Sequence, residues 1–236
     1  MALNAGITVK YLGHATFLFT TGDGKRVLID PWVEHNPACP PQDRNLPGLD
    51  LMLITHAHPD HMQDAVALAR RFQPDVVCNF EISVWLGSKG VGKVTSMNKG
   101  GTVSIGNLRV TMVNAFHSSG IIEGDRVIYG GEPAGYVVEF GNGFRIYHAG
   151  DTCVFGDMRL IGELYRPDLV FLPIGDVFTM DPLQAAHACR LLEAKKVVPM
   201  HYGTFPLLTG TPEKLRELTR DQQVEVIALK PGETLA

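Results

Sequence analysis

Cysteine is scarce in this sequence, and the few cysteines stand far apart. Four occur among 236 residues, and no two form a CxxC pair. A disulfide framework or a zinc ribbon needs closely spaced cysteines, so we expect neither, and we expect reduced thiols in the cytoplasm. Residues 1–6 contain neither the basic nor the apolar segment of a secretory signal. No apolar run approaches the length of a membrane-spanning helix, so no membrane partner is expected.

Charge is also sparse and nearly balanced. The chain has 21 Lys and Arg against 25 Asp and Glu, a net charge of −4, and no basic run. Nucleic-acid-binding surfaces concentrate positive charge, so we expect a small-molecule substrate and no nucleic-acid partner. With 45% hydrophobic residues the chain can bury a large core, which predicts one domain over residues 1–236. The oligomeric state is left open, with a homo-oligomer as one alternative.

The densest group of candidate metal ligands follows a short apolar run. Residues 51–54 predict a buried strand, and residues 62–72 predict a helix. Four candidate metal ligands stand between them: His56, His58, Asp60 and His61. Imidazole and carboxylate groups suit a divalent transition metal. Pro59 disfavours a helical conformation in the residues before it, so the first two ligands can face one metal and the last two a second. A histidine-rich surface loop that binds metal by accident is the alternative.

Further ligand types follow other predicted strands. His117 comes after a strand over 108–115, and His201 comes after a strand over 197–200, which makes both candidate nitrogen ligands. Asp151 follows a strand over 144–148 and a glycine, a position that suits a carboxylate bridging two cations; a turn or helix-capping aspartate is the alternative. His14 lies in a bend, where a turn histidine with a satisfied hydrogen bond is the alternative to a functional role.

The remaining pattern predicts short strands alternating with helices. The two stretches 1–115 and 116–236 are comparable, which indicates internal pseudo-symmetry with two sheets face to face and helices outside. Two long loops, Pro31–Asp50 and Gly120–Pro133, are expected to wall a pocket. The other expected strands are 7–12, 15–20, 26–30, 75–78, 102–105, 135–140, 169–172 and 224–229, and the other expected helices are 81–89, 156–165, 182–194 and 211–220.

The order HxHxDH, His, Asp, His resembles the metallo-β-lactamase superfamily. Shorter motifs are similar to its branch of uncharacterised metal-dependent hydrolases related to ascorbate-6-phosphate lactonase. These motifs are Tyr11–Ala15, Ile29–Pro31, Ala115–Ser119, Tyr147–Thr152, Pro173–Asp176, Phe178–Met180 and His201–Pro206. The resemblance covers nearly the whole chain. It implies an α/β fold, a four-layer αββα sandwich with two mixed sheets and helices outside.

The resemblance also implies a two-metal hydrolase site. In that site His56, His58 and His117 hold the first metal, Asp60, His61 and His201 hold the second, and Asp151 bridges them. Zinc is the expected metal, with manganese, iron or nickel as alternatives. A hydroxide shared by the metals would attack a small ester, lactone or phosphodiester. Asp60 would orient this nucleophile, and His14 is the candidate acid for the leaving group; His148 is a second candidate, with a strand-end histidine bonded to backbone as its alternative.

Three other functions remain open on the same scaffold. A di-iron oxidoreductase would use the same ligands. An RNA-cutting nuclease or phosphodiesterase would need an extra arm between Asp151 and His201 and more positive charge, and neither is visible. A non-enzymatic metal-binding protein is the third alternative. Cys153 departs from the family pattern, which has glycine after Asp-Thr. A packed thiol is expected there, and a thiol that intrudes near the metals is the alternative.

Overall fold

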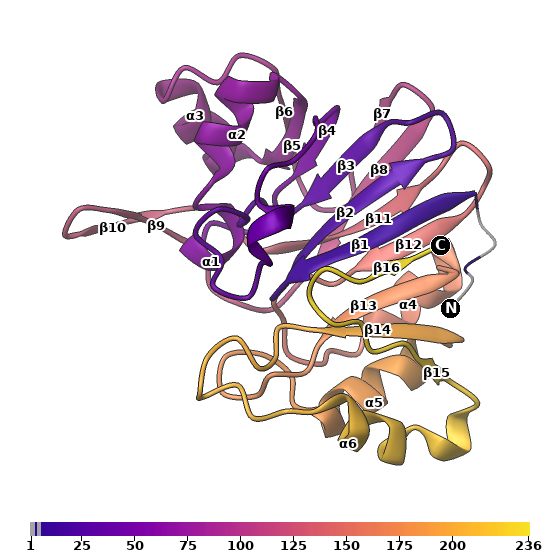
Figure 1. The fold of residues 1–236 in the computed structure, drawn as a ribbon. Coiled ribbons are helices and arrows are strands. Elements are labelled where there is room, and N and C mark those ends of the chain that lie inside the picture. The colour runs from indigo at the N-terminus through magenta and orange to yellow at the C-terminus, as the bar shows by residue number, and fades with distance from the viewer. Residues whose placement is uncertain (1–2, 4–5) are drawn as a thin grey trace. The chain divides into compact units, whose positions relative to one another are not determined.

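The computed structural model describes residue 3 and residues 6–236, which form two compact units (Figure 1). The first unit contains residues 1–98, 118–133 and 230–236, and the second contains 99–117 and 134–229. The predicted division into halves at residue 115 is therefore wrong. The two units alternate along the sequence. The hairpin that ends at Asn114 belongs to the sheet of the second unit, whereas the C-terminal strand belongs to the sheet of the first. One domain over 1–236 stays a prediction.

The first unit is built on a seven-stranded mixed sheet. Its order is β16-β1-β2-β3-β4-β5-β6, antiparallel from β16 to β3 and parallel from β3 to β6. The strands are β1 (Ile7–Gly13), β2 (Thr16–Thr21), β3 (Arg26–Ile29), β4 (Leu51–Leu53), β5 (Asp75–Asn79), β6 (Val94–Met97) and β16 (Thr234–Leu235). A separate hairpin, β9 (Gly120–Glu123) with β10 (Arg126–Tyr129), also belongs to this unit.

Alternate side chains of the first sheet form its core with the helices. Leu28, Met52 and Val76 project to one face, where they join one buried cluster with Leu68 and Ile82 from the helices. The helices of this unit are η1 (Pro41–Asp43), α1 (Pro59–Met62), α2 (Ala65–Phe72) and α3 (Phe80–Ser88). This period of two along each strand sets which residues face the helices and which face the other side of the sheet.

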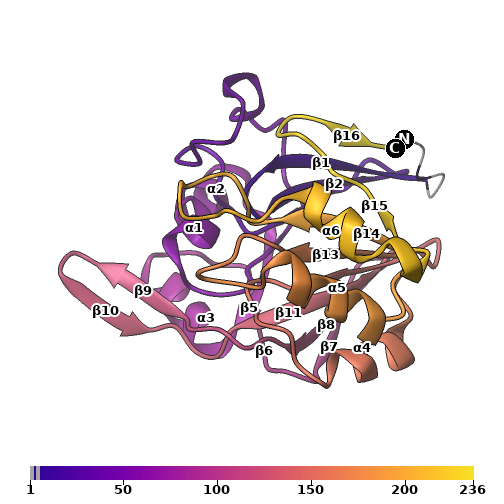
Figure 2. The same ribbon diagram turned by 90° about the horizontal axis from the view of Figure 1, so that it is seen from below.

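The second unit repeats the sheet pattern. Its order is β7-β8-β11-β12-β13-β14-β15, antiparallel from β7 to β12 and parallel from β12 to β15. The strands are β7 (Thr102–Ile105), β8 (Leu108–Asn114), β11 (Ala134–Glu139), β12 (Arg145–His148), β13 (Leu169–Pro173), β14 (Lys196–Met200) and β15 (Glu225–Val226). The helices are α4 (Met158–Tyr165), α5 (Pro182–Leu191), α6 (Pro212–Leu218) and η2 (Arg220–Gln222). Figure 2 shows α4, α5 and α6 on one side of this sheet.

The predicted pseudo-symmetry and two mixed sheets are confirmed. In each sheet three antiparallel pairings are followed by three parallel ones, so β1, β3, β4 and β5 correspond to β8, β12, β13 and β14. A local contact repeats as well. The Asp50 carboxylate accepts a 2.8 Å hydrogen bond from Arg26 N at the start of β3, and the Asp168 carboxylate accepts one of 2.8 Å from Arg145 N at the start of β12.

Three predicted elements differ from the structure. The helix expected over 62–72 is broken before Ala65, because Asp64 N donates to Pro31 O instead of continuing the helix. The loop expected over 120–133 is the β9–β10 hairpin; Gly124, at φ 59, takes the first central position of its two-residue turn. The strand expected over 224–229 is reduced to Glu225–Val226, since the chain then leaves the edge of the second sheet.

Among the described residues no helix is both long and apolar enough to cross a bilayer.

Candidate metal centre

In the first unit three strand ends bring polar side chains to one edge of the sheet. β1 and β3 run in the same direction because each is antiparallel to β2, and β4 is parallel to β3. Their C-terminal ends therefore meet at the same edge, where α/β sheets place their ligands. His14 follows β1, Asp30 follows β3, and Thr55 to His61 follow β4. His14 and Asp30 both have left-handed backbones, with φ of 61 and 56.

Pro59 sets the local conformation of the histidine loop, as predicted from the sequence. His58 is extended, with φ −72 and ψ 148, and α1 begins at Pro59. His56 and His58 thus precede the helix, with His58 extended, whereas Asp60 and His61 stand in the first helical turn. The one loop presents its four ligand types in two pairs.

Asp30 is the centre of a buried hydrogen-bond network at this edge. Its carboxylate accepts from Thr55 N at 2.8 Å, from Thr55 Oγ1 at 2.9 Å and from His61 Nδ1 at 2.8 Å. Asp30 and His61 are fully buried, and Thr55 is 1% exposed. A buried carboxylate is stabilised by such charge-assisted bonds.

The network fixes the tautomers of two histidines. Thr55 Oγ1 has one hydrogen, which it gives to Asp30, so at 3.0 Å it accepts from His56 Nδ1. His61 likewise gives its Nδ1 proton to Asp30. Neutral imidazole with the proton on Nδ1 keeps its lone pair on Nε2, the state required of a metal ligand. The donor chemistry of both side chains therefore fits a divalent transition metal.

His58 lies against His56 in the same unit. Its Nδ1 is 3.0 Å from His56 Nε2, and its Nε2 is 3.3 Å from Ser118 Oγ. If Nε2 donates to Ser118, then Nδ1 keeps a lone pair that points at the same place as that of His56. A cation between the two nitrogens would relieve the repulsion between these lone pairs.

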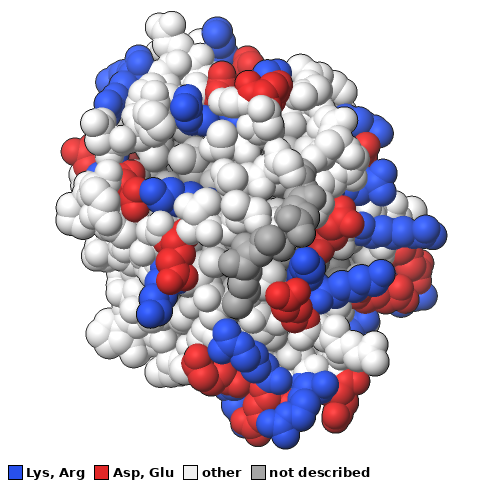
Figure 3. All heavy atoms as spheres, turned by 45° about the vertical axis from the view of Figure 1, so that its right-hand side comes forward, with Lys and Arg blue, Asp and Glu red and all other residues white. Residues whose placement is uncertain are grey.

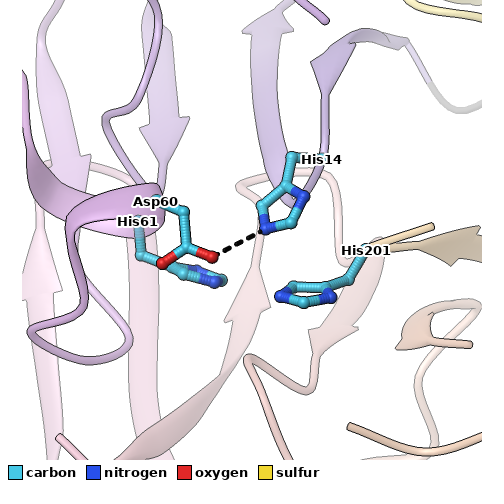
Figure 4. Close-up of side chains that lie close together, drawn as sticks. All are labelled: His14, Asp60, His61 and His201. Carbon is cyan, nitrogen blue, oxygen red and sulfur yellow. Dashed lines mark hydrogen bonds and ion pairs between the residues drawn. The ribbon is translucent and has the colours of Figure 1, made fainter. Parts of the chain in front are cut away.

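The His14 side chain contacts Asp60, so its role is not limited to stabilising the turn. Its Nε2 donates to Asp60 Oδ2 across 3.1 Å, and Figure 4 shows that carboxylate turned toward the His14 ring with His61 beside it. Donor atoms of these three side chains lie within 4.8 Å of one another. Trp32 packs its ring edge-on to His14, with centroids 5.2 Å apart. His14 is fully buried, so its imidazole is held in place on all sides.

In the second unit the corresponding strand ends carry the other candidates. β8, β12 and β14 all end at one edge of their sheet and lead to His117, Asp151 and His201. Asp151 Oδ2 is 3.0 Å from His201 Nε2 and 3.6 Å from His117 Nε2. Asp151 and His201 are 2% and 1% exposed. One carboxylate oxygen of Asp151 thus faces two imidazole nitrogens.

Backbone hydrogen bonds fix these ligand positions. Thr152 Oγ1 accepts from Phe116 N at 3.0 Å, and Cys153 N donates to Phe116 O at 3.2 Å, so the segments that carry His117 and Asp151 are joined. Thr152 is fully buried, whereas Cys153 is exposed. The predicted packed thiol at Cys153 is wrong, because Thr152 takes the inward position and its neighbour on extended chain faces outward.

His148 takes the structural role that the sequence left as its alternative. Its Nδ1 accepts from Gly150 N at 3.2 Å, and its ring stacks on Phe171 with centroids 5.9 Å apart. Both contacts fix the turn before Asp151.

Two carboxylates of the first unit were missed as functional residues. Asp30 was noted only as part of a motif. Asp64 was not noted; it is 3% exposed and accepts from Val33 N at 2.6 Å and Glu34 N at 2.8 Å, which fastens the loop that follows Asp30. The sequence signal for Asp30 was its place at the end of the strand expected over 26–30, whereas Asp151 was singled out because it follows a strand and a glycine.

A protein-family model described as "Beta-lactamase superfamily domain" matches residues 25–202. The chain belongs to this superfamily. A UPF0173 metal-dependent hydrolase of Koribacter versatilis is 52% identical over 229 residues, which is 97% of each chain. At that similarity the chain also belongs to the UPF0173 metal-dependent hydrolases. The predicted superfamily and enzyme class, metal-dependent hydrolase, are confirmed.

Solved structures show the same fold. Igni18, described as a novel metallo hydrolase from Ignicoccus hospitalis, is 36% identical to this UPF0173 protein, with 97% of each chain covered and a TM-score of 0.86. CmlA, a diiron β-hydroxylase from Streptomyces venezuelae, is 18% identical, with a TM-score of 0.75 over 97% of this chain and 54% of its own. That second likeness shows a shared fold alone. The predicted α/β fold of the metallo-β-lactamase type is confirmed.

Proposed function

We propose that this protein hydrolyses a small ester, lactone or phosphodiester with the help of two divalent metal ions. His56, His58 and His117 would hold one ion, Asp60, His61 and His201 the other, and Asp151 would bridge them. Zinc is the expected metal, with manganese, iron or nickel as alternatives. When bound, two such ions lower the pKa of a water molecule toward neutrality and offset the charge that develops on the substrate.

The buried Asp30 network is the observation that carries this proposal. Metal-ligating histidines characteristically donate their second ring nitrogen to a carboxylate or hydroxyl, which fixes the ring and raises its basicity. His61 does so directly to Asp30 at 2.8 Å, and His56 does so through Thr55 Oγ1 at 3.0 Å. A structural role alone would not require both rings to keep Nε2 as an acceptor at the same sheet edge.

The residues of the chain also supply positioning and a proton. His14 holds a proton on Nε2, 3.1 Å from Asp60 Oδ2. This proton can pass to a leaving group that comes close to His14, while the Asp60 carboxylate orients the attacking water. His14 is fully buried and packed by Trp32, so it offers the proton at one fixed point.

Two features support a small substrate. The loop Pro31–Asp50 is fastened by Asp64 and by Asn36, which is fully buried and donates to Gly13 O at 3.1 Å, so this loop is a fixed wall and not a polymer-gripping arm. The chain has a net charge of −4, and on the face shown in Figure 3 Lys and Arg lie beside Asp and Glu without forming one positive patch. A protein of this charge offers little electrostatic attraction to a polyanion.

Metal stoichiometry and substrate screening test the proposal together. Protein purified without chelator is loaded with zinc, manganese, iron or nickel, analysed for bound metal, and assayed on esters, lactones and phosphodiesters. We expect two equivalents per chain and hydrolysis in one substrate class. His61→Ala should lower the count, whereas His187→Ala, which changes an exposed histidine of α5, should not. Saturation at one equivalent, unchanged in His61→Ala, would contradict the two-metal site. Visible absorption with oxidase activity would indicate the di-iron alternative.

A further inference from the structure

The loop after β13 occupies a central place in the second sheet. β13 lies between β12 and β14 and is parallel to both, so residues 174–180 stand between the strand ends that carry Asp151 and His201. By the repeated sheet pattern, β13 corresponds to β4 of the first unit, which carries the His56–His61 loop. The sequence of residues 174–180 is IGDVFTM, which contains no histidine and no positive charge. The loop therefore has the position of a site loop, but it carries no histidine ligand.

Backbone contacts join this loop to both candidate ligand segments. On one side Ile174 N donates to Met200 O at 3.0 Å, and a Cβ on Gly175 would come within 2.1 Å of His201 O. On the other side Met180 N donates to Thr152 O at 3.1 Å. The loop is thus fixed beside His201 and beside the residue that follows Asp151.

The tip of the loop is strained and apolar. Asp176 and Val177 both have left-handed backbones, with φ of 69 and 56. For a β-branched residue such as valine this conformation is an outlier, and it persists only where the surroundings impose it, often at functional sites. Val177 and Phe178 are nevertheless 59% and 52% exposed. Their side chains contribute little to the core, so burial does not account for the strained tip.

The only charged side chain at the tip of the loop is the Asp176 carboxylate, and it already accepts a hydrogen bond. Asp176 Oδ1 accepts from Val177 N at 2.7 Å, and Asp176 O accepts from Phe178 N at 2.6 Å. This turn directs two apolar side chains outward beside a carboxylate. An anionic group would be repelled at that place, whereas an uncharged apolar group would cover Val177 and Phe178.

We propose that Val177 and Phe178 bind the uncharged, apolar part of the substrate next to the reacting bond. This inference rests on the proposed hydrolase function and narrows its substrate class to esters or lactones with an alkyl or aryl substituent, in preference to phosphodiesters. Val177 and Phe178 are specificity-determining residues, and they take no part in the chemical step.

The test compares p-nitrophenyl acetate, butyrate and hexanoate with zinc-loaded protein. Wild type should prefer the longer chains by about twofold per methylene group, which is roughly half of the free energy that complete burial of a methylene gives, or about sixteenfold over the four methylene groups from acetate to hexanoate. The double variant Val177→Gly with Phe178→Ala should lose most of this preference. Leu164→Ala is the matched control, because Leu164 is 70% exposed near the end of α4 that leads to the opposite edge of the sheet. It should keep the wild-type preference.

A second measurement separates this inference from the proposed function. Acetate, butyrate and hexanoate are titrated against the same zinc-loaded proteins by NMR, which reports binding without turnover. Wild type should bind the longer carboxylates more tightly, and the double variant should not. If no ester, lactone or phosphodiester is hydrolysed but this dependence on Val177 and Phe178 is found, the hydrolase proposal fails and the apolar site stands. Equal chain-length dependence in wild type and double variant would overturn the inference, whether or not esters are cleaved.

Thermal unfolding of Val177→Gly excludes a structural explanation. Glycine adopts φ 56 freely, so the variant should unfold at the wild-type temperature or above it. A lower unfolding temperature together with unchanged chain-length preference would show that Val177 serves the fold, and would overturn its assignment to substrate binding.

Discussion

The Asp30 carboxylate accepts the Nδ1 proton of His61 at 2.8 Å, and both side chains are completely buried. Asp30 directly follows β3, and Asp151 lies three residues beyond β12, the strand that corresponds to β3 in the repeated sheet pattern. The two carboxylates have different surroundings. Asp30 accepts three hydrogen bonds from Thr55 and His61, whereas Asp151 faces two imidazoles through one oxygen. The loops after two corresponding strands thus hold a positioning carboxylate in one unit and a candidate bridging ligand in the other.

Asp30→Asn should weaken metal binding without removing a ligand. The amide keeps the shape but loses the charge that holds the Nδ1 protons of His61 and, through Thr55, of His56, so we expect metal affinity to fall about 10–100-fold. Competition with a chromophoric chelator measures this change. Asp50→Asn is the control, because the exposed Asp50 carboxylate also accepts a backbone N–H, from Arg26. Equal affinity in both variants and wild type would show that Asp30 serves only the fold.

Loss of the Asp151 carboxylate should reduce metal binding more than loss of a single surface charge would. Asp151→Ala removes the anion between the two proposed cations, so it should release at least one metal equivalent, and Asp151→Asn should keep the shape but bind less metal than wild type. Metal analysis and ester hydrolysis are the measurements. Asp168→Asn, at an exposed aspartate that accepts from Arg145 N, is the control. Full metal content and activity in both Asp151 variants would make Asp151 a turn residue.

Loss of His14 should affect poor leaving groups most. His14 holds a proton at Nε2 beside Asp60, and p-nitrophenolate leaves without needing one, whereas an alkoxide does need one. In His14→Gln we expect kcat to fall about 100-fold for alkyl esters and far less for p-nitrophenyl esters. His187→Gln should leave both rates unchanged. An equal decrease for both ester types in His14→Gln would contradict proton donation and assign His14 to positioning of Asp60.

Thiol titration should distinguish the four cysteines. Cys39, Cys78 and Cys189 are at most 1% exposed, and burial raises the pKa of their thiols to about 11, 12 and 12. These thiols stay protonated at neutral pH and inaccessible, whereas Cys153 is exposed. An aromatic disulfide reagent should therefore label one thiol per native chain and four in denaturant. In Cys153→Gly the native count should be zero; a remaining rapid reaction would mean that another thiol is accessible.

Long single-stranded RNA should neither be cut nor inhibit hydrolysis of a model ester at moderate salt. The chain has a net charge of −4, so it offers little electrostatic attraction to a polyanion. The measurements are gel analysis of the RNA and the ester rate in its presence. Efficient cleavage of structured RNA that is abolished by His58→Ala would favour the nuclease alternative.

Local sequence was sufficient to predict the strand ends and the ligand types. A buried strand followed by Gly, His or Asp is a short-range pattern, and Pro59 acts on the residue directly before it. For this reason His56 and His58 were placed correctly on the loop after β4, whereas Asp60 and His61 lie in the helical turn that follows it. The strands around Asp151 and His201 were also predicted within one residue at their C-terminal ends, because apolar runs end where polar turns begin.

Contacts between distant residues were decided only by the tertiary structure. Asp30 meets His61 because β3 and β4 are parallel and in a register that pairs Ile29 with Leu53, and no local pattern specifies that register. The helix is interrupted at Asp64, which forms hydrogen bonds with a loop about 30 residues earlier in the chain. Thr152 takes the buried position beside Asp151, which leaves Cys153 exposed. The sequence by itself determined which side chains can bind metal, since that depends on residue type and neighbours. The tertiary structure decided which nitrogen each histidine offers, because that depends on hydrogen bonds from residues far away in the chain.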